Sequence, residues 1–410
     1  MKKLYCTLYT IVFMGIGVLT TLIGQYLNGI GFTGDQIGMV TAAGTCVAIF
    51  AAPFWGRRYA RLNRQRSRFL LLAGVLLCAA AVSLVLRSLS LFPLVLAVYA
   101  LLYFFQSPAA SLMDALTLDD GMRFGHIRTF GALGFAVACL GAAYLADHLG
   151  TEMILPAYAF CYVAAAAMVL VLRSQHSGLN AKAGQPLDGD AGSAADAETG
   201  LDLDEPADRP GTTFREVYQS LGSIPPYVFL LMCAFFTNGT DAANNTYFSF
   251  LYLEGGGTLA GVGVAFLLMA GSEAPFMAAS DWLGDRFGQG RILLVALIFS
   301  VIRFGLFALG LPAPVLIALF PLQGLVNGIR LVEFVKLVSC LVPEHLRGPG
   351  IAVYYALGSS FSGIVCQLIG GHLLESGLFG LTGPQSVYLF FAVFNIAGVV
   401  TFIAAGLHRD

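Results

Sequence analysis

The sequence predicts an all-α integral membrane protein with twelve transmembrane helices, and its composition, hydropathy and length each point to this class. Of the 410 residues, 57% are hydrophobic and only 11% are charged, whereas about 25% of residues are charged in a typical soluble protein. The mean hydropathy is +0.78. Because a membrane-spanning helix needs about 20 apolar residues, the chain has room for roughly twelve spans with short loops. These values exclude an ordinary soluble enzyme, a nucleic-acid-binding protein and a disordered scaffold.

Apolar segments follow one another along the chain. The first begins after Lys2 and Lys3 and continues past Tyr26 without a small-residue cleavage site, so it is predicted to be a membrane helix and not a signal peptide. Five more segments lie near 36–55, 69–88, 91–116, 125–146 and 153–172. After a polar gap, six others lie near 226–252, 259–280, 292–310, 314–341, 349–373 and 386–407.

The loops differ strongly in charge. When the N-terminus is placed in the cytoplasm, Arg87 is the lone basic residue of the outer loops. All other loop lysines and arginines then fall on the cytoplasmic side, for example Arg57, Arg58, Arg61, Arg286 and Arg347. Basic residues favour cytoplasmic loops, so both termini are predicted to be cytoplasmic. The expected location is the plasma (inner) membrane.

The polar gap at 174–213 is rich in Asp, Glu, Ala, Gly and Pro and has no apolar periodicity. Such a composition cannot bury enough apolar surface to fold alone, so this segment is predicted to be an acidic, disordered cytoplasmic linker. It divides the chain into an N-terminal six-helix half at 1–173 and a C-terminal six-helix half at 214–410. The linker is either a simple tether or a regulatory segment.

The two halves carry related loops. The loop at 56–63 and the loop at 281–288 are both short, basic and internal, and they follow the second and eighth predicted helices. Two groups of six helices joined by a long central loop resemble the duplicated plan of the major facilitator superfamily. The resemblance implies the major facilitator fold and transport by alternating access.

The second of these loops resembles the superfamily's gating motif, Gly-x-x-x-Asp-Arg-x-Gly. Asp285, Arg286 and Gly288 match the motif, and Asp281 replaces its first Gly. In the N-terminal copy Ala60 replaces the acidic residue, which departs from the family pattern. The resemblance implies that the four residues of the second copy belong to a gating loop.

The fifth predicted helix gives a closer resemblance. Residues 124–135, FGHIRTFGALGF, are similar to the fifth helix of the lactose permease and phenylpropionate permease branch of proton symporters. In that branch an arginine matching Arg128 pairs with a carboxylate that matches Asp114, so the resemblance implies that this pair binds solute. Phe135 replaces the tryptophan on which galactosides stack, which argues against a galactoside.

Charges of the C-terminal half extend the resemblance. Asp241 matches a membrane-embedded acid of the lactose permease, while Glu273 and Arg303 match an acid and an arginine of both relatives. The resemblance implies that these three residues couple proton and solute movement. The charged positions of the family's tenth helix are not kept, and charge lies further along instead, at Arg330, Glu333 and Lys336. These three residues are further candidates for proton coupling, or they form a structural ion network near the inner end of the helix.

A charge at the bilayer centre costs about 2.5–3.5 kcal/mol on insertion scales, so charges within these spans indicate function or pairing. Glu333 has a cation three residues away on each side and is expected to pair along one helix face and stay ionised. Glu273 is expected to pair with Arg303. Asp241 has no cation within one turn, so burial should favour its protonated form and make it the preferred proton carrier, with Glu273 as the alternative. A competing possibility is that Arg303 or Arg330 contacts Asp241 in the folded bundle.

Uncharged polar residues within the spans predict a solute-binding cavity. Together with Asp114, Arg128 and Phe135, the candidates for solute binding are Tyr26, Tyr103, Gln106, Asn245, Gln323 and Asn327. Each of them could also serve as a contact between helices.

No catalytic, metal-binding or nucleotide-binding motif is present in the sequence, and no filter-loop repeat is present either. The predicted function is therefore proton-coupled symport of a small polar organic solute, driven by a proton gradient without a cofactor, by a monomer in the lipid bilayer. A sugar or oligosaccharide is the favoured solute. The alternatives are an aromatic carboxylate or nucleoside, or export of a drug or metabolite.

Overall fold

The computed structural model describes residues 2–62, 64–120, 124–182 and 219–408, except for the side chains of 124–126, 128 and 177–182. Almost all of this chain is helical. The N-terminal half consists of α1 (Lys2–Gly29), α2 (Gly34–Ala60), α3 (Gln65–Arg87), α4 (Phe92–Asp119), α5 (Phe124–Leu149) and α6 (Ile154–Lys182), with the short 3-10 helix η1 (Thr151–Met153) before α6.

The C-terminal half has more interrupted helices. It contains α8 (Pro225–Glu254), α9 (Leu259–Phe287), α10 (Gln289–Ala308), α11 (Ala313–Ala318), α12 (Phe320–Leu341), η2 (Glu344–Leu346), α13 (Arg347–Val353), η3 (Tyr354–Phe361), α14 (Ser362–Ser376) and α15 (Gly383–Ala404). The segment η3 is a π-helix between α13 and α14, a geometry that is often found at functional sites.

Eleven helical segments of the described chain are long and apolar enough to cross a membrane. Helix α8 is not among them, although it is 30 residues long. It carries the polar residues Asn238, Asp241, Asn244 and Asn245, which lower its hydropathy. The protein is thus a multi-pass membrane protein, and the twelfth span stays a prediction.

Only the beginning of the predicted linker at 174–213 lies within the described residues. Helix α6 continues to Lys182, so the predicted linker boundary at 173 falls inside a helix. The remainder of the predicted linker, 183–213, lies outside the described residues.

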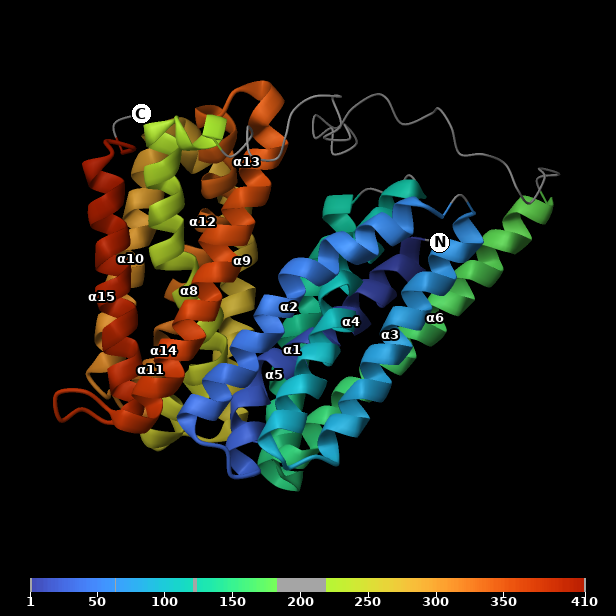
Figure 1. The fold of residues 1–410 in the computed structure, drawn as a ribbon, viewed down its shortest axis with the longest axis horizontal. Coiled ribbons are helices and arrows are strands. Elements are labelled where there is room, and N and C mark those ends of the chain that lie inside the picture. The colour runs from blue at the N-terminus through green and yellow to red at the C-terminus, as the bar shows by residue number, and fades with distance from the viewer. Residues whose placement is uncertain (1, 63, 121–123, 183–218, 409–410) are drawn as a thin grey trace.

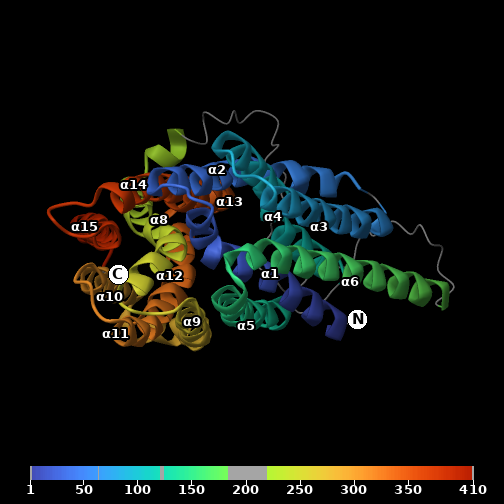
Figure 2. The same ribbon diagram turned by 90° about the horizontal axis from the view of Figure 1, so that it is seen from below.

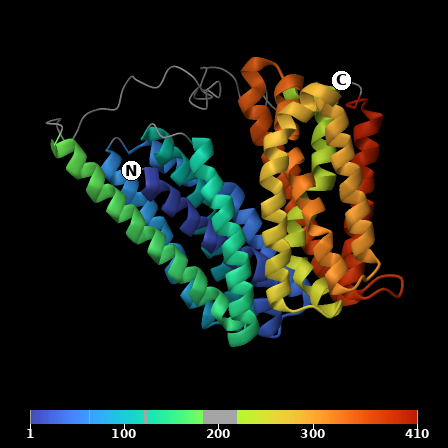
Figure 3. The same ribbon diagram turned by 180° about the vertical axis from the view of Figure 1, so that it is seen from behind.

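The two halves stand side by side, and they touch near one end and lean apart toward the other (Figures 1 and 3). Both termini and the last turn of α6 lie toward the end at which the halves lean apart (Figure 1). We call the end at which the halves touch the closed end. Seen from the closed end, α2 lies beside α14 and α5 lies beside α9 (Figure 2).

Polar contacts join the halves at the closed end. The Gln25 amide donates to the Ser249 hydroxyl at 3.0 Å, and the backbone N–H of Gly34 donates to Glu375 at 2.8 Å. His372 Nδ1 lies 3.2 Å from Asp35 Oδ1. The first contact joins α1 to α8, and the other two hold the ends of α2 and α14 together.

A buried carboxylate joins helices at the opposite end of the N-terminal half. The hydroxyl of Tyr5 and the amide of Gln65 donate to Asp120, and His176 Nε2 lies 3.5 Å from it. Burial raises the pKa of the Asp120 carboxyl, although these three partners oppose the shift. Helices α1, α3, α4 and α6 are thereby linked where the sequence shows only isolated polar residues.

The arrangement generates a topology prediction. Asp285 is exposed near the end of α9, and Phe379 is 87% exposed between α14 and α15 at the opposite end of the bundle. With Cys46, Cys78 and Cys340 replaced by Ser, an Asp285→Cys variant should react with an impermeant maleimide only after the cells are opened. The matched variant Phe379→Cys should react in intact cells. The reverse pattern would contradict cytoplasmic termini.

Candidate functional site

A cavity of about 170 Å³ lies between the two halves. Its walls come from α1, α2 and α4 of one half and from α8 and α14 of the other. The lining residues are Thr20, Ile23, Thr41, Thr45, Tyr99, Tyr103, Ala242, Asn245, Thr246 and Gln367. All ten are uncharged, so the wall offers hydroxyls, amides and aromatic rings but no ionised group.

Aromatic rings form the α4 side of the cavity. The centroids of the Tyr99 and Tyr103 rings are 4.9 Å apart. Gly44 on α2 faces both rings, and a Cβ at this position would lie 2.8 Å from Tyr99 and 3.0 Å from Tyr103. Glycine at position 44 therefore lets α2 approach the rings closely.

The predicted binding residues divide between the cavity and the protein interior. Tyr103 and Asn245 line the cavity, as expected for solute-binding residues. Tyr26 and Gln106 are buried elsewhere, with the Tyr26 hydroxyl and the Gln106 Oε1 atom lacking hydrogen bonds among the described residues. Phe135 packs against the hydrophobic cluster of the C-terminal half, so it joins the halves and does not line the cavity.

Of the predicted pair Asp114 and Arg128, the structure describes only the side chain of Asp114. The Tyr9 hydroxyl donates to Asp114 Oδ1 at 2.7 Å, while the side chain of Arg128 lies outside the described residues. The pair and its role in binding stay predictions.

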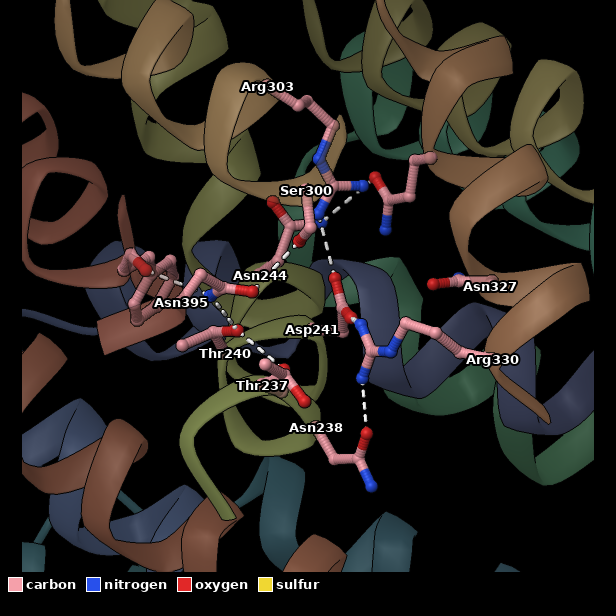
Figure 4. A network of polar contacts seen from close by, with 12 residues as sticks. Thr237, Asn238, Thr240, Asp241, Asn244, Ser300, Arg303, Asn327, Arg330 and Asn395 are labelled. Atoms are coloured by element: carbon pink, nitrogen blue, oxygen red, sulfur yellow. Dashed lines mark hydrogen bonds and ion pairs between the residues drawn. The ribbon is translucent and has the colours of Figure 1, made fainter. Parts of the chain in front are cut away.

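A second polar centre lies inside the C-terminal half (Figure 4). Arg303 of α10 donates to Asp241 Oδ1 of α8 at 2.7 Å, and Arg330 of α12 donates to Asp241 Oδ2 and to Asn238. The side chains of Arg303, Arg330 and Asp241 are only 0%, 7% and 13% exposed. One carboxylate thus serves two buried guanidinium groups from different helices.

Amides and hydroxyls surround this charge centre. Asn244 donates to Gln323 at 3.3 Å and accepts from Tyr388 at 2.8 Å. Asn395 of α15 donates to Thr240 at 2.8 Å. The predicted binding residue Gln323 therefore supports the interior of the C-terminal half. Figure 4 shows Asn244, Thr240 and Asn395 of this network beside Asp241.

The pairing within this centre corrects two expectations. Asp241, expected to lack a nearby cation, has two, because α10 and α12 bring Arg303 and Arg330 to it. Arg303 was expected to pair with Glu273, but it is bound to Asp241 instead. The partly buried Glu273 interacts with the amide of Asn327.

Glu333 and Lys336 form a separate group. Lys336 Nζ lies 2.9 Å from Glu333 and 2.6 Å from Asp281 of α9, and Ser280 donates to Glu333 at 2.5 Å. Arg330 was expected to pair with Glu333 along the same helix. It contacts Asp241 instead, because a carboxylate on a neighbouring helix is within its reach.

The predicted gating loop is helical up to Phe287: Asp281, Asp285 and Arg286 lie in the last turns of α9, and Gly288 separates α9 from α10. Gly288 has a φ of 90° and ends α9, a conformation that other residues rarely adopt. Arg286 lies over the Trp282 ring, 5.5 Å from its centroid, and Asp285 is exposed. Only Asp281 of the predicted loop residues reaches the neighbouring α12, through Lys336; the gating role stays a prediction.

Comparison with known proteins identifies the family. The model of the MFS_1 like family matches residues 4–388. The chain belongs to this family of major facilitator transporters. The predicted resemblance to this superfamily is confirmed, and the protein is a membrane transporter and not an enzyme.

Relatives of this major facilitator protein cover it almost completely. The maltose permease of Geobacillus stearothermophilus is 31% identical over 407 residues, which cover 98% of this chain and 94% of the permease. The uncharacterised transporter YwbF of Bacillus subtilis (strain 168) is 25% identical over 395 residues, covering 95% of this chain and 90% of YwbF. The crystal structure of the nucleoside transporter NupG has a TM-score of 0.77 at 18% identity and covers 99% of this chain and 98% of its own.

The charge centre of this transporter generates a stability prediction. Asp241→Ala leaves Arg303 and Arg330 buried without their carboxylate, so it should lower the free energy of unfolding by about 3–5 kcal/mol. Adding Arg330→Met removes one excess cation and should restore part of the loss. Thermal unfolding in detergent measures both effects, with Asn395→Ala as the uncharged control. A midpoint for Asp241→Ala equal to that of the wild type would contradict this account.

Proposed function

We propose that this major facilitator transporter carries a sugar or oligosaccharide together with protons. The observation that carries the proposal is the uncharged cavity between the halves, which combines threonine hydroxyls, the amides of Asn245 and Gln367, and the rings of Tyr99 and Tyr103. Hydroxyls and amides can both donate and accept hydrogen bonds, as a neutral polyhydroxyl solute requires. The flat faces of tyrosine rings suit the apolar faces of sugar rings.

The relationship to the maltose permease supports the same solute class. At 31% identity over 98% of this chain, it makes a disaccharide the first compound to test. An oligosaccharide would have to extend beyond the described cavity of about 170 Å³.

A nucleoside is the second candidate, because the paired rings of Tyr99 and Tyr103 could also stack on a nucleobase. An aromatic carboxylate is less favoured. No cation lines the described cavity, and Arg303 and Arg330 are bound to Asp241.

Glu273 is the proposed proton carrier. Two guanidinium groups bind Asp241 and favour its ionised form, which makes Asp241 a poor carrier. Glu273 is partly buried, and among the described residues its partner is the Asn327 amide, with no lysine or arginine within ion-pair distance. A carboxyl in such an environment can exist in both protonation states, as a carrier must.

The proposed cycle follows from the shape of the molecule. The halves touch at one end and lean apart at the other (Figure 1), and the cavity between them has walls from both. Rocking of the halves about the cavity would expose it to each side of the membrane in turn.

Uptake into proteoliposomes tests this function. With an inward proton gradient, labelled maltose should accumulate with saturable kinetics, and an uncoupler should abolish its accumulation. A nucleoside and benzoate should neither accumulate nor compete. Uptake of the nucleoside alone would replace the sugar proposal, and maltose accumulation that is insensitive to the uncoupler would remove proton coupling.

A further inference from the structure

Two residues of the cavity wall form a hydrogen bond between the halves, and a third wall residue binds one of them. The Thr41 hydroxyl of α2 lies 3.1 Å from Gln367 Oε1 of α14 and can donate to it. The same hydroxyl lies 2.9 Å and 3.1 Å from the Ile37 and Gly38 carbonyls of its own helix, so its single proton is shared among these three acceptors. The Gln367 amide in turn donates to the Thr246 hydroxyl of α8 at 3.0 Å. All three line the cavity, and Thr41 and Gln367 are only 4% and 5% exposed.

The helices next to this chain of hydrogen bonds are in very close contact. A Cβ on Gly371 would lie 2.9 Å from Gly38 Cα, and a Cβ on Gly38 would lie 3.1 Å from Gly371 Cα. Gly38 precedes Thr41 by one turn of α2, and Gly371 follows Gln367 by one turn of α14. The backbone of Gln367 is fixed as well, since Tyr247 donates to its carbonyl at 2.6 Å.

The other described side-chain contacts between the halves are not in the cavity wall. Three polar contacts join the halves elsewhere: Gln25 with Ser249, Asp35 with His372, and the Gly34 N–H with Glu375. None of these six residues lines the cavity. A solute in the cavity can therefore compete directly for the bond between Thr41 and Gln367.

We propose that Gln367 is a positioning residue that senses the solute and holds the closed end of the transporter shut. In the empty cavity its amide binds Thr41 across the halves. A solute hydroxyl that donates to Oε1, or accepts from Thr41, replaces this bond. Since the replaced bond joins the halves while this end is closed, its loss shifts the population toward the state open at this end. We call the hydrogen bond between Thr41 and Gln367 the latch. Its replacement by a solute rests on the proposed function, but the latch itself does not.

Distance measurements by electron paramagnetic resonance test the latch. Spin labels are placed at Asn28→Cys and Phe379→Cys, two exposed positions in different halves near the closed end, with Cys6, Cys46, Cys78 and Cys340 replaced by Ser. Without solute, Thr41→Val should raise the ratio of long to short distances about 2- to 10-fold, the range expected for one net hydrogen bond. Thr41→Ser keeps the hydroxyl and should restore the wild-type distribution.

Thr45→Val is the matched control. Thr45 also lines the cavity, but its hydroxyl donates to the Thr41 carbonyl within α2 and does not cross between the halves. This variant should leave the distance distribution unchanged. Gln367→Leu removes the bond from the other side and should reproduce the Thr41→Val shift.

The distance measurements distinguish failure of the latch from failure of the sugar proposal. If Thr41→Val and Gln367→Leu both keep the wild-type distribution, the latch is wrong, whatever the solute is. If they open the closed end but maltose does not open the wild type, the latch stands and the sugar proposal fails. If maltose opens the wild type and adds less in Thr41→Val, both stand.

Discussion

The contact between one buried carboxylate and two buried guanidinium groups determines how the C-terminal half is built. An unpaired charge is very costly away from water, and removing one partner of a buried pair leaves that cost uncompensated. Arg303 on α10 and Arg330 on α12 both depend on Asp241 of α8. These three helices must therefore pack so that their charges meet, and the amides and hydroxyls around them complete the polar interior.

Helix α8 connects this charge centre to the cavity. Asp241 and Asn238 bind the arginines on one face, while Ala242, Asn245 and Thr246 of the same helix line the cavity. A change in the pairing of Asp241 would shift a helix that forms part of the cavity wall. The N-terminal half contributes rings and hydroxyls to that wall, so the two halves share the cavity lining.

Hydropathy was sufficient to predict most of the helices, because a span in lipid must be long and apolar. Helix α8 is long but is not among the apolar spans of the described chain. Hydropathy failed to show that α6 continues to Lys182, where polar residues follow the apolar run. Individual charges were recognised as important, but their partners were not. The i, i+3 spacing predicted that Arg330 pairs with Glu333, yet Asp241 on another helix is the partner, and sequence spacing carries no distance between helices. The cavity residues Tyr99 and Gln367 were missed for the same reason, since the sequence does not show which neighbour a single polar residue of a span faces. For Tyr99 one signal was available, because it precedes Tyr103 by four residues and so lies on the same helix face.

We propose that proton coupling resides in Glu273, apart from the solute cavity. Glu273→Gln mimics the protonated carboxyl, so this variant should still exchange labelled for unlabelled maltose across a proteoliposome membrane but should lose accumulation driven by a proton gradient. Glu333→Gln makes the same chemical change on α12 and leaves Asp281 to pair with Lys336, so it should keep both activities. Gradient-driven accumulation at the wild-type level in Glu273→Gln would contradict the account, and loss of accumulation together with exchange would place Glu273 in solute binding instead.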